Sequence, residues 1–157
     1  MLINNSTFIH VGQIHVDTPP ASISTVLGSC VAVCLYDKVN KIGGMNHYLL
    51  PFWNANGLQS PKYGNIAIPK LIEHMLDHGA SLKFIEAKIF GGASINMAVS
   101  KSMMIGEKNI LVAREILKEN KINIVAEDVG EKNGRKIQFN LESGKVLLKY
   151  TQNSNIK

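Results

Sequence analysis

The pattern of hydrophobic and polar positions predicts strands at both ends of the chain and alternating strands and helices in its middle. "SISTVL" and "KIGGMNHYLL" are predicted strands, and "CVAVCLY" between them is apolar on both faces, as in a central strand covered on two sides. Apolar residues recur at helical spacing over 66–78 and again near 109–118, which predicts two helices. "FIEAKIF", "INIVAEDV" and the hairpin "RKIQFNL-ESG-KVLLKY" complete the predicted strands.

These elements predict an α/β fold with one mixed sheet and helices lying over it. We expect a single domain over 1–157 with a core of about 22–150. Residues 1 to about 21 are predicted to be an irregular start with at most one short strand, and 151–157 a frayed tail. Two long Gly-containing loops, 51–65 and 91–109, are the expected place of substrate choice.

Composition narrows the class of protein without naming a function. Hydrophobic residues make up 45% of the chain and charged residues 18%, which fits one soluble domain. The net charge of +5 suggests an acidic partner surface, but the basic residues are scattered and no basic–aromatic block points to nucleic acid. No apolar run approaches the roughly 20 residues of a membrane span. Because the N-terminus does not resemble a signal peptide, we expect a cytoplasmic protein with reduced thiols.

The two cysteines, Cys30 and Cys34, are predicted to have different roles. If the strands on either side of 37–40 form a hairpin with a four-residue loop, Cys30 lies opposite His47. Directly opposed residues have Cβ atoms about 5 Å apart, close enough for a thiol and an imidazole to share a proton. Cys34 lies deeper in the apolar run and is predicted to be core.

The chemistry of a cysteine nucleophile fits Cys30 at this position. A free thiol is only a few per cent ionised at neutral pH, and a neighbouring imidazolium would stabilise its thiolate. The turn at Gly28-Ser29 can expose the sulfur, and the backbone N–H groups of Ser29 and Cys30 can face an oxyanion.

Other interpretations of the same residues remain open at this point. Cys30 can be a small buried residue and His47 a hydrogen-bonded sheet histidine. Zinc on Cys30, Cys34 and His47 would be one ligand short of a closed site. A disulfide is geometrically poor, because Cα atoms at i and i+4 of a strand lie about 13 Å apart against a limit of about 7 Å. His74 and His78 lack the glutamate of a zinc-protease motif. The segment "IFGGAS" lacks the ending of a phosphate-binding loop, so we predict that it is a tight turn that brings backbone close to the site.

Six motifs, taken in order, resemble the CheD family of chemoreceptor glutamine deamidases. They are "LGSCVAVCLYD", "IGGMNHYLLP", "KYGNIAIPKLIEHM", "AKIFGGA", "IGEKN" and "EDVGEKNGRKIQF", which together extend over most of the chain. The resemblance implies a three-layer α/β sandwich and hydrolysis of selected glutamine side chains to glutamate on the cytoplasmic helices of methyl-accepting chemotaxis proteins. It implies that the reaction needs no metal and no organic cofactor. It also implies that a CheC-type phosphatase is a partner. A regulatory binding module that acts mainly through that phosphatase is the alternative function.

The resemblance also assigns roles to individual residues. Cys30 matches the nucleophile and His47 the general base. A third, hydroxyl-bearing position falls on Ser24, a departure from the threonine that is usual there, with adjacent Thr25 as the alternative. A second departure from the family is Gly130-Glu131, where a glycine pair is usual, and it leaves the shape of that loop open.

Overall fold

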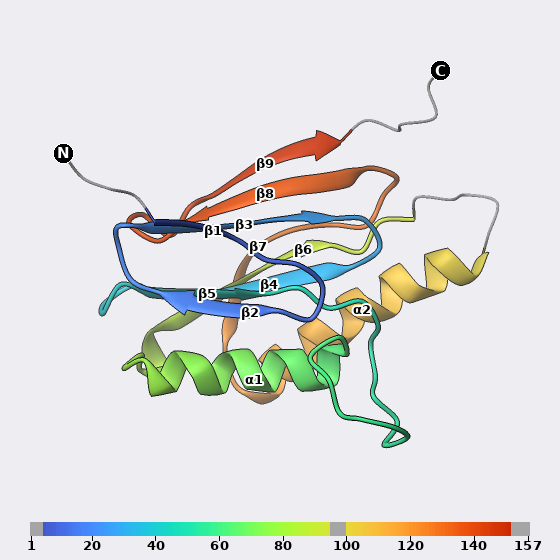
Figure 1. The fold of residues 1–157 in the computed structure, drawn as a ribbon, viewed down its shortest axis with the longest axis horizontal. Coiled ribbons are helices and arrows are strands. Elements are labelled where there is room, and N and C mark those ends of the chain that lie inside the picture. The colour runs from blue at the N-terminus through green and yellow to red at the C-terminus, as the bar shows by residue number, and fades with distance from the viewer. Residues whose placement is uncertain (1–4, 95–99, 152–157) are drawn as a thin grey trace.

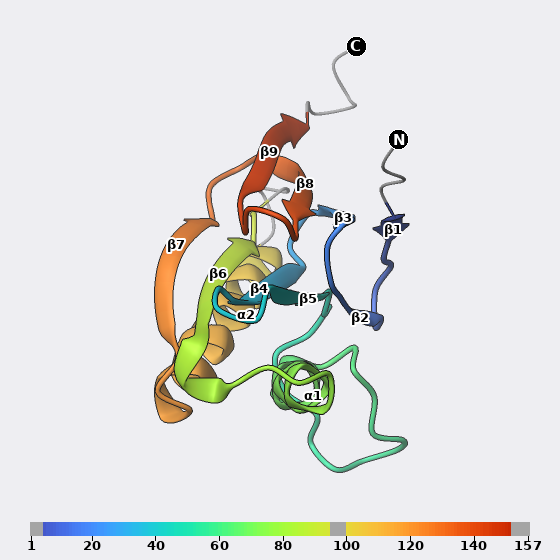
Figure 2. The same ribbon diagram turned by 90° about the vertical axis from the view of Figure 1, so that its left-hand side faces the viewer.

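The computed structural model describes residues 5–94 and 100–151, which form two β-sheets and a layer of helices stacked in that order (Figure 1, Figure 2). The outer sheet has the order β1 (Asn5–Phe8), β3 (Ala21–Leu27), β8 (Gly134–Asn140) and β9 (Val146–Thr151). The inner sheet has the order β2 (Ile14–Asp17), β5 (Ile42–Asn46), β4 (Val31–Asp37), β6 (Ile85–Gly91) and β7 (Asn123–Val129). The helices are α1 (Gly64–Asp77) and α2 (Ser100–Glu119), with a short 3₁₀ turn at Leu82–Phe84.

The three-layer α/β sandwich is confirmed, but the prediction of one sheet is wrong. Each sheet is mixed, because β1 runs parallel to β3 and β7 parallel to β6 while the other pairings are antiparallel. The predicted irregular start contains two strands, β1 and β2, one in each sheet. β1 is a short polar edge strand, which carries no hydrophobic pattern to predict it.

Two hydrophobic cores lie on either side of the inner sheet, and β4 contributes to both. Val31, Val33 and Leu35 face the helices, whereas Ala32 and Cys34 face the outer sheet. The predicted central strand covered on both faces is therefore confirmed, as is the prediction that Cys34 belongs to the core, where it is 1% exposed.

The second helix begins nine residues earlier than the sequence predicts, at Ser100 instead of 109. The misleading signal is Gly106, which resembles a loop glycine but lies inside α2. A Cβ at Gly106 would approach the carbonyl oxygen of Gly92 to 2.5 Å, so glycine here lets the helix backbone contact the loop that follows β6. Of the predicted loop 91–109, residues 95–99 lie outside the described residues, as does 152–157 of the predicted tail.

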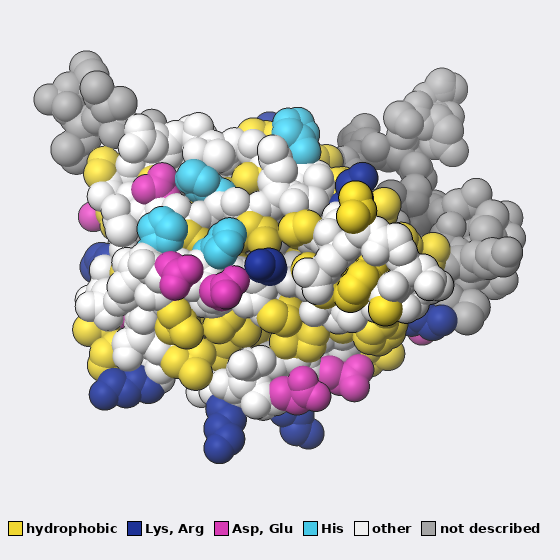
Figure 3. All heavy atoms as spheres, turned by 60° about the horizontal axis from the view of Figure 1, so that its bottom comes forward, with side chains coloured by type: hydrophobic (Ala, Val, Ile, Leu, Met, Phe, Trp, Pro, Cys, Tyr) yellow, Lys and Arg dark blue, Asp and Glu magenta, His cyan; other side chains and the backbone are white. Residues whose placement is uncertain are grey.

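Basic and acidic side chains lie intermixed on the face that carries the helices (Figure 3). The net charge of +5 is therefore not gathered into one patch on that face. Neither described helix is long and apolar enough to cross a membrane.

Candidate active site

Cys30 lies at the end of the turn that carries the chain from the outer sheet (β3) to the inner sheet (β4), and it is partly buried. The N–H of Gly92 donates to the carbonyl of Cys30 at 2.8 Å, and the N–H of Ala93 donates to the carbonyl of Gly28 at 3.0 Å. Gly91 has a φ of +108°, and a Cβ there would collide with the Cys30 carbonyl oxygen. The prediction that "IFGGAS" is a turn allowing close backbone approach is confirmed for the backbone of Cys30.

His47 follows β5 and is 5% exposed. The predicted pairing of Cys30 with His47 is wrong by two residues: Asp37 pairs with Ile42, and Val31 bridges to Tyr48. Asp37 explains the shift, because its carboxylate accepts the N–H groups of two of the next three residues, at 2.9 and 2.8 Å, and so the loop begins one residue later than predicted.

A shift of two residues leaves both side chains on the same face of the sheet, since strand side chains alternate with a period of two. His47 is therefore a diagonal neighbour of Cys30 and not its direct partner. In the described part of the chain, no hydrogen bond joins the Cys30 sulfur to the His47 ring. Catalytic hydrogen bonds are often long in a protein without its substrate and tighten when the substrate binds.

Of the two hydroxyl candidates, the structure places Thr25 and not Ser24 against His47. Thr25 is buried, and its Oγ1 lies 2.7 Å from Nδ1 of the ring. Ser24 alternates to the opposite face of β3 and is partly exposed. Alternation of the side chains along "SISTVL" is the signal that could have made this choice, because Ile23, Thr25 and Leu27 share the buried face.

The hydrogen bonds of Thr25 also fix the tautomer of His47. Thr25 Oγ1 donates to the carbonyl of Ile9 at 2.8 Å, and a hydroxyl has only one proton to donate. With both bonds made, the hydroxyl accepts from His47, so the ring carries its proton on Nδ1. Nε2 is then unprotonated and can accept a proton, as a general base must.

Burial makes both groups neutral in the resting protein. It raises the pKa of the Cys30 thiol, although the backbone N–H of Cys30 opposes this shift. Burial and, to a lesser extent, the charge of His10 lower the pKa of His47 to about 4. The imidazolium–thiolate pair suggested by the sequence is therefore not the resting form, and the thiol proton must move to His47 as the sulfur attacks.

The N-terminal segment contributes to this site, which the sequence patterns did not indicate. The carbonyl of Ile9 accepts from Thr25, and the N–H of Gly12 donates to the carbonyl of His47 at 2.8 Å. His10 lies close enough for its charge to lower the pKa of His47. These contacts depend on strand pairing between β1 and β3, so no local pattern could have predicted them.

The predicted oxyanion donors, the N–H groups of Ser29 and Cys30, lie in the β3–β4 turn. Among the described residues, neither N–H donates a hydrogen bond to another residue, and the N–H of Cys30 faces its own thiol. Neither donor therefore has an acceptor on another residue of the described ranges.

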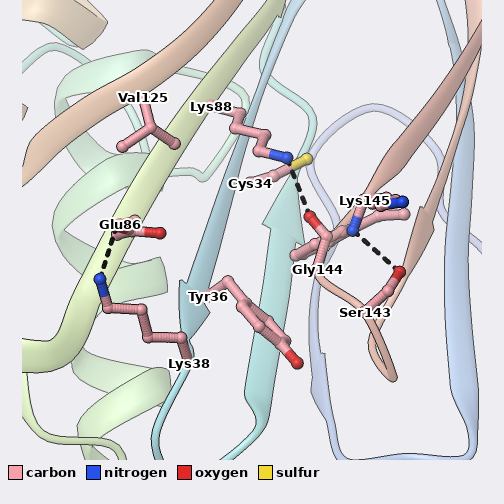
Figure 4. A pocket seen from close by; sticks show the side chains of 10 residues that line it. Cys34, Tyr36, Lys38, Glu86, Lys88, Val125, Ser143, Gly144 and Lys145 are labelled. Atoms are coloured by element: carbon pink, nitrogen blue, oxygen red, sulfur yellow. Dashed lines mark hydrogen bonds and ion pairs between the residues drawn. The ribbon is translucent and has the colours of Figure 1, made fainter.

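Cys34 has no part in this geometry. Both cysteines are free thiols, and burial raises the pKa of Cys34 far above its ordinary value. Cys34 lies instead beside Lys88 and Tyr36 in a separate cavity of about 310 Å³ between β4, β6 and the β8–β9 turn (Figure 4). Within 5–94 and 105–151, no three His, Cys, Asp or Glu side chains lie together as metal ligands.

Comparison with known proteins places the chain in a family. A family model described as "CheD chemotactic sensory transduction" matches residues 49–150. A Sulfurimonas denitrificans protein named "Probable chemoreceptor glutamine deamidase CheD" is 55% identical over 146 residues, which cover 92% of this chain and 94% of that protein. The chain belongs to the CheD family. A Trichlorobacter lovleyi protein with the same name is 47% identical over 141 residues, covering 90% of this CheD chain and 88% of its own.

A solved Neisseria meningitidis structure of the family model DUF152 shares the fold with this CheD chain. Its TM-score is 0.51 with 12% sequence identity, and the match covers 81% of this chain and 64% of that one. At this identity the likeness concerns the fold alone. Family membership, which the six motifs predicted, is confirmed. Cys30 and His47 precede the range that the family model matches.

Proposed function

We propose that this CheD protein hydrolyses glutamine side-chain amides on the cytoplasmic helices of methyl-accepting chemotaxis receptors, with Cys30 as nucleophile and His47 as general base. The names of its relatives support a glutamine deamidase that acts on chemoreceptors. The observation that carries the mechanism is the chain of hydrogen bonds from Ile9 through Thr25 to His47. It leaves Nε2 of His47 as a proton acceptor on the face of the sheet that also carries Cys30.

The first half of the reaction forms a thioester. The Cys30 sulfur attacks the amide carbon while its proton moves to Nε2 of His47. The N–H groups of Ser29 and Cys30 donate to the oxyanion of the tetrahedral intermediate. The carbon–nitrogen bond then breaks, His47 returns the proton to the nitrogen, and ammonia leaves.

The second half consumes one water molecule. His47 removes a proton from water as its oxygen attacks the thioester carbon, the carbon–sulfur bond breaks, and the thiol regains its proton. Glutamate remains on the receptor. Thr25 does not react; it keeps the proton of His47 on Nδ1 through both halves, as the third member of a triad does.

The experiment that tests this proposal is incubation with receptor cytoplasmic fragments from the same organism, followed by peptide mass spectrometry. We expect conversion of specific glutamines to glutamates, and no conversion by Cys30→Ala. Cys34→Ala is the matched control and should retain activity, because Cys34 belongs to the core between the sheets. An active Cys30→Ala protein would contradict the assigned nucleophile.

Association with a CheC-type phosphatase is a separate part of the proposal and is measured by calorimetric titration of the two purified proteins. A protein that leaves every receptor fragment unmodified but binds the phosphatase tightly would instead be the regulatory module.

A further inference from the structure

Asn109 lies in α2 with no exposed surface, and its side-chain amide joins the two segments that carry Cys30 and His47. Its Nδ2 donates to the carbonyl of Ser29 at 3.0 Å and to the carbonyl of Leu49 at 3.0 Å. The hydroxyl of Tyr48 donates in turn to the backbone carbonyl of Asn109. One residue of α2 therefore contacts the residue before Cys30 and both residues that follow His47.

The chemistry of its neighbours fixes the orientation of the Asn109 amide. Both Ser29 and Leu49 present carbonyl oxygens, which only accept, so the atom that faces them is the nitrogen. Oδ1 then has no hydrogen-bond partner among the described residues, although it is buried. An unpaired buried acceptor destabilises the folded protein, and an apolar side chain would avoid that cost. A need for two donors at this position explains why asparagine occupies it.

The bond to Ser29 orients the peptide group that leads into Cys30. In a trans peptide the C=O and the N–H point in opposite directions, so a carbonyl directed at Asn109 leaves the Cys30 N–H directed away from it. That N–H donates to no other described residue; it faces its own sulfur, and this contact lowers the thiol pKa. It is therefore held beside the nucleophile, where an oxyanion would form.

We propose that Asn109 is a positioning residue, whose amide holds the Ser29–Cys30 peptide in the plane that aims its N–H at the oxyanion and ties this peptide to the segment after His47. This inference rests on the proposed deamidase function and deepens it. Asn109 itself touches neither substrate nor reacting atoms. Its effect is confined to steps that form an oxyanion.

The test compares Asn109→Ala with Asn120→Ala, a matched control. Asn120, which follows the C-terminal end of α2, also donates its Nδ2 to a backbone carbonyl, that of Ile116 at 2.8 Å. For Asn109→Ala we expect kcat on a receptor fragment to fall about 10- to 100-fold with KM changed less than about threefold, because a misaligned oxyanion donor weakens only the transition state. Asn120→Ala should stay within about twofold of wild type in both constants.

Alkylation of Cys30 by iodoacetamide separates positioning from a general structural defect. Displacement of iodide at a saturated carbon forms no oxyanion, so the alkylation rate of folded Asn109→Ala should stay within about threefold of wild type. An alkylation loss equal to the loss of kcat would overturn the inference, as would an unchanged kcat.

Amide resonances distinguish failure of this inference from failure of the proposed function. In ¹⁵N–¹H spectra, Asn109→Ala should shift the Cys30 and Leu50 signals, whose peptide groups contain the two accepting carbonyls, and Asn120→Ala should leave them in place. Unshifted signals would overturn the positioning role of Asn109 even if wild-type protein proves inactive. Inactive wild-type protein with shifted signals would refute only the proposed deamidase activity.

Discussion

The replacement of Thr25 by valine tests the orienting role of its hydroxyl in the most direct way. Valine matches threonine in shape but removes both hydrogen bonds of Oγ1, at 2.7 Å to His47 and 2.8 Å to Ile9. Two buried polar groups, Nδ1–H of His47 and the Ile9 carbonyl, then lose their partner. At roughly 1–3 kcal/mol for each unsatisfied group, the free energy of unfolding should fall by about 2–6 kcal/mol.

Thr25→Val should also lower the activity, by more than the loss of folded protein can explain. Without an acceptor at Nδ1, nothing holds the proton there, and the ring can adopt the tautomer that carries its proton on Nε2 and cannot accept one. In triads, a wrong tautomer lowers kcat by up to about 10,000-fold, so we expect a loss of about 100- to 10,000-fold. The assay is the rate of mass gain in a receptor fragment, measured at a temperature where denaturation curves show the variant to be folded.

Two control variants make the reasoning refutable. Thr25→Ser keeps a hydroxyl at the same atom and should retain activity within about tenfold. Ser24→Ala removes the neighbouring hydroxyl, which faces away from His47, and should stay within about threefold of wild type. A severe loss in Ser24→Ala combined with an active Thr25→Val would refute the assignment and return it to Ser24.

Three further predictions follow from the same contacts. His47 must be neutral to accept a proton, so kcat/KM should fall as pH drops through about 4, as a pH–rate profile will show. Folding depresses the pKa of His47, so the favourable contribution of neutral His47 to stability is complete above pH 6.5 and is lost as pH falls toward 4. In urea titrations, the free energy of unfolding of the wild type should fall by up to about 3 kcal/mol over this window, and that of His47→Gln should not show this fall. Gly91→Ala should cost at least about 3 kcal/mol, because its Cβ would collide with the backbone of Cys30 at a positive φ, whereas Gly57→Ala, with a positive φ but nothing within 4 Å, should cost only about 1 kcal/mol in thermal melts.

The sequence predicted elements well where burial is dictated by a local pattern. β4 is apolar on both faces because it lies between two cores, and its pattern alone indicated this. The division between Cys30 at the turn and Cys34 in the core followed from the same strand. Local patterns failed where pairing partners decide the outcome: β1 is a four-residue edge strand with a polar sequence, and its parallel partner β3 lies thirteen residues further along the chain.

The register of the β4–β5 hairpin shows how a single side chain overrides a geometric rule. The shortest plausible loop begins at Asp37, but this residue serves the turn with its side chain while its backbone stays in the strand. The N–H of Ser81 and the side chain of Asn40 also donate to its carboxylate, each at 2.8 Å. A contact from a residue so distant in the sequence could not be read from the hairpin alone.

Close approach of backbones, more than side-chain packing, explains why the site requires particular residues around Cys30. The Gly91–Gly92 turn lies against the carbonyl of Cys30, and Gly106 brings α2 against Gly92. This approach places α2, and with it the Asn109 amide, within reach of the turn before Cys30. The loop at Gly130-Glu131 supports the same turn, because Gly130 donates its N–H to Gly91 at 2.9 Å.

Glu131, in the loop whose shape the sequence left open, adopts a φ of +63°, which lies in the left-handed region that favours glycine. Its carbonyl accepts the N–H of Ser94 at 2.8 Å, a contact that ties the loop to the residues following the glycine turn. A side chain at positive φ is disfavoured, so Glu131 adds local strain of about 1 kcal/mol to this loop. The two hydrogen bonds, from Gly130 to Gly91 and from Ser94 to Glu131, hold this loop against the glycine turn on which the backbone of Cys30 rests.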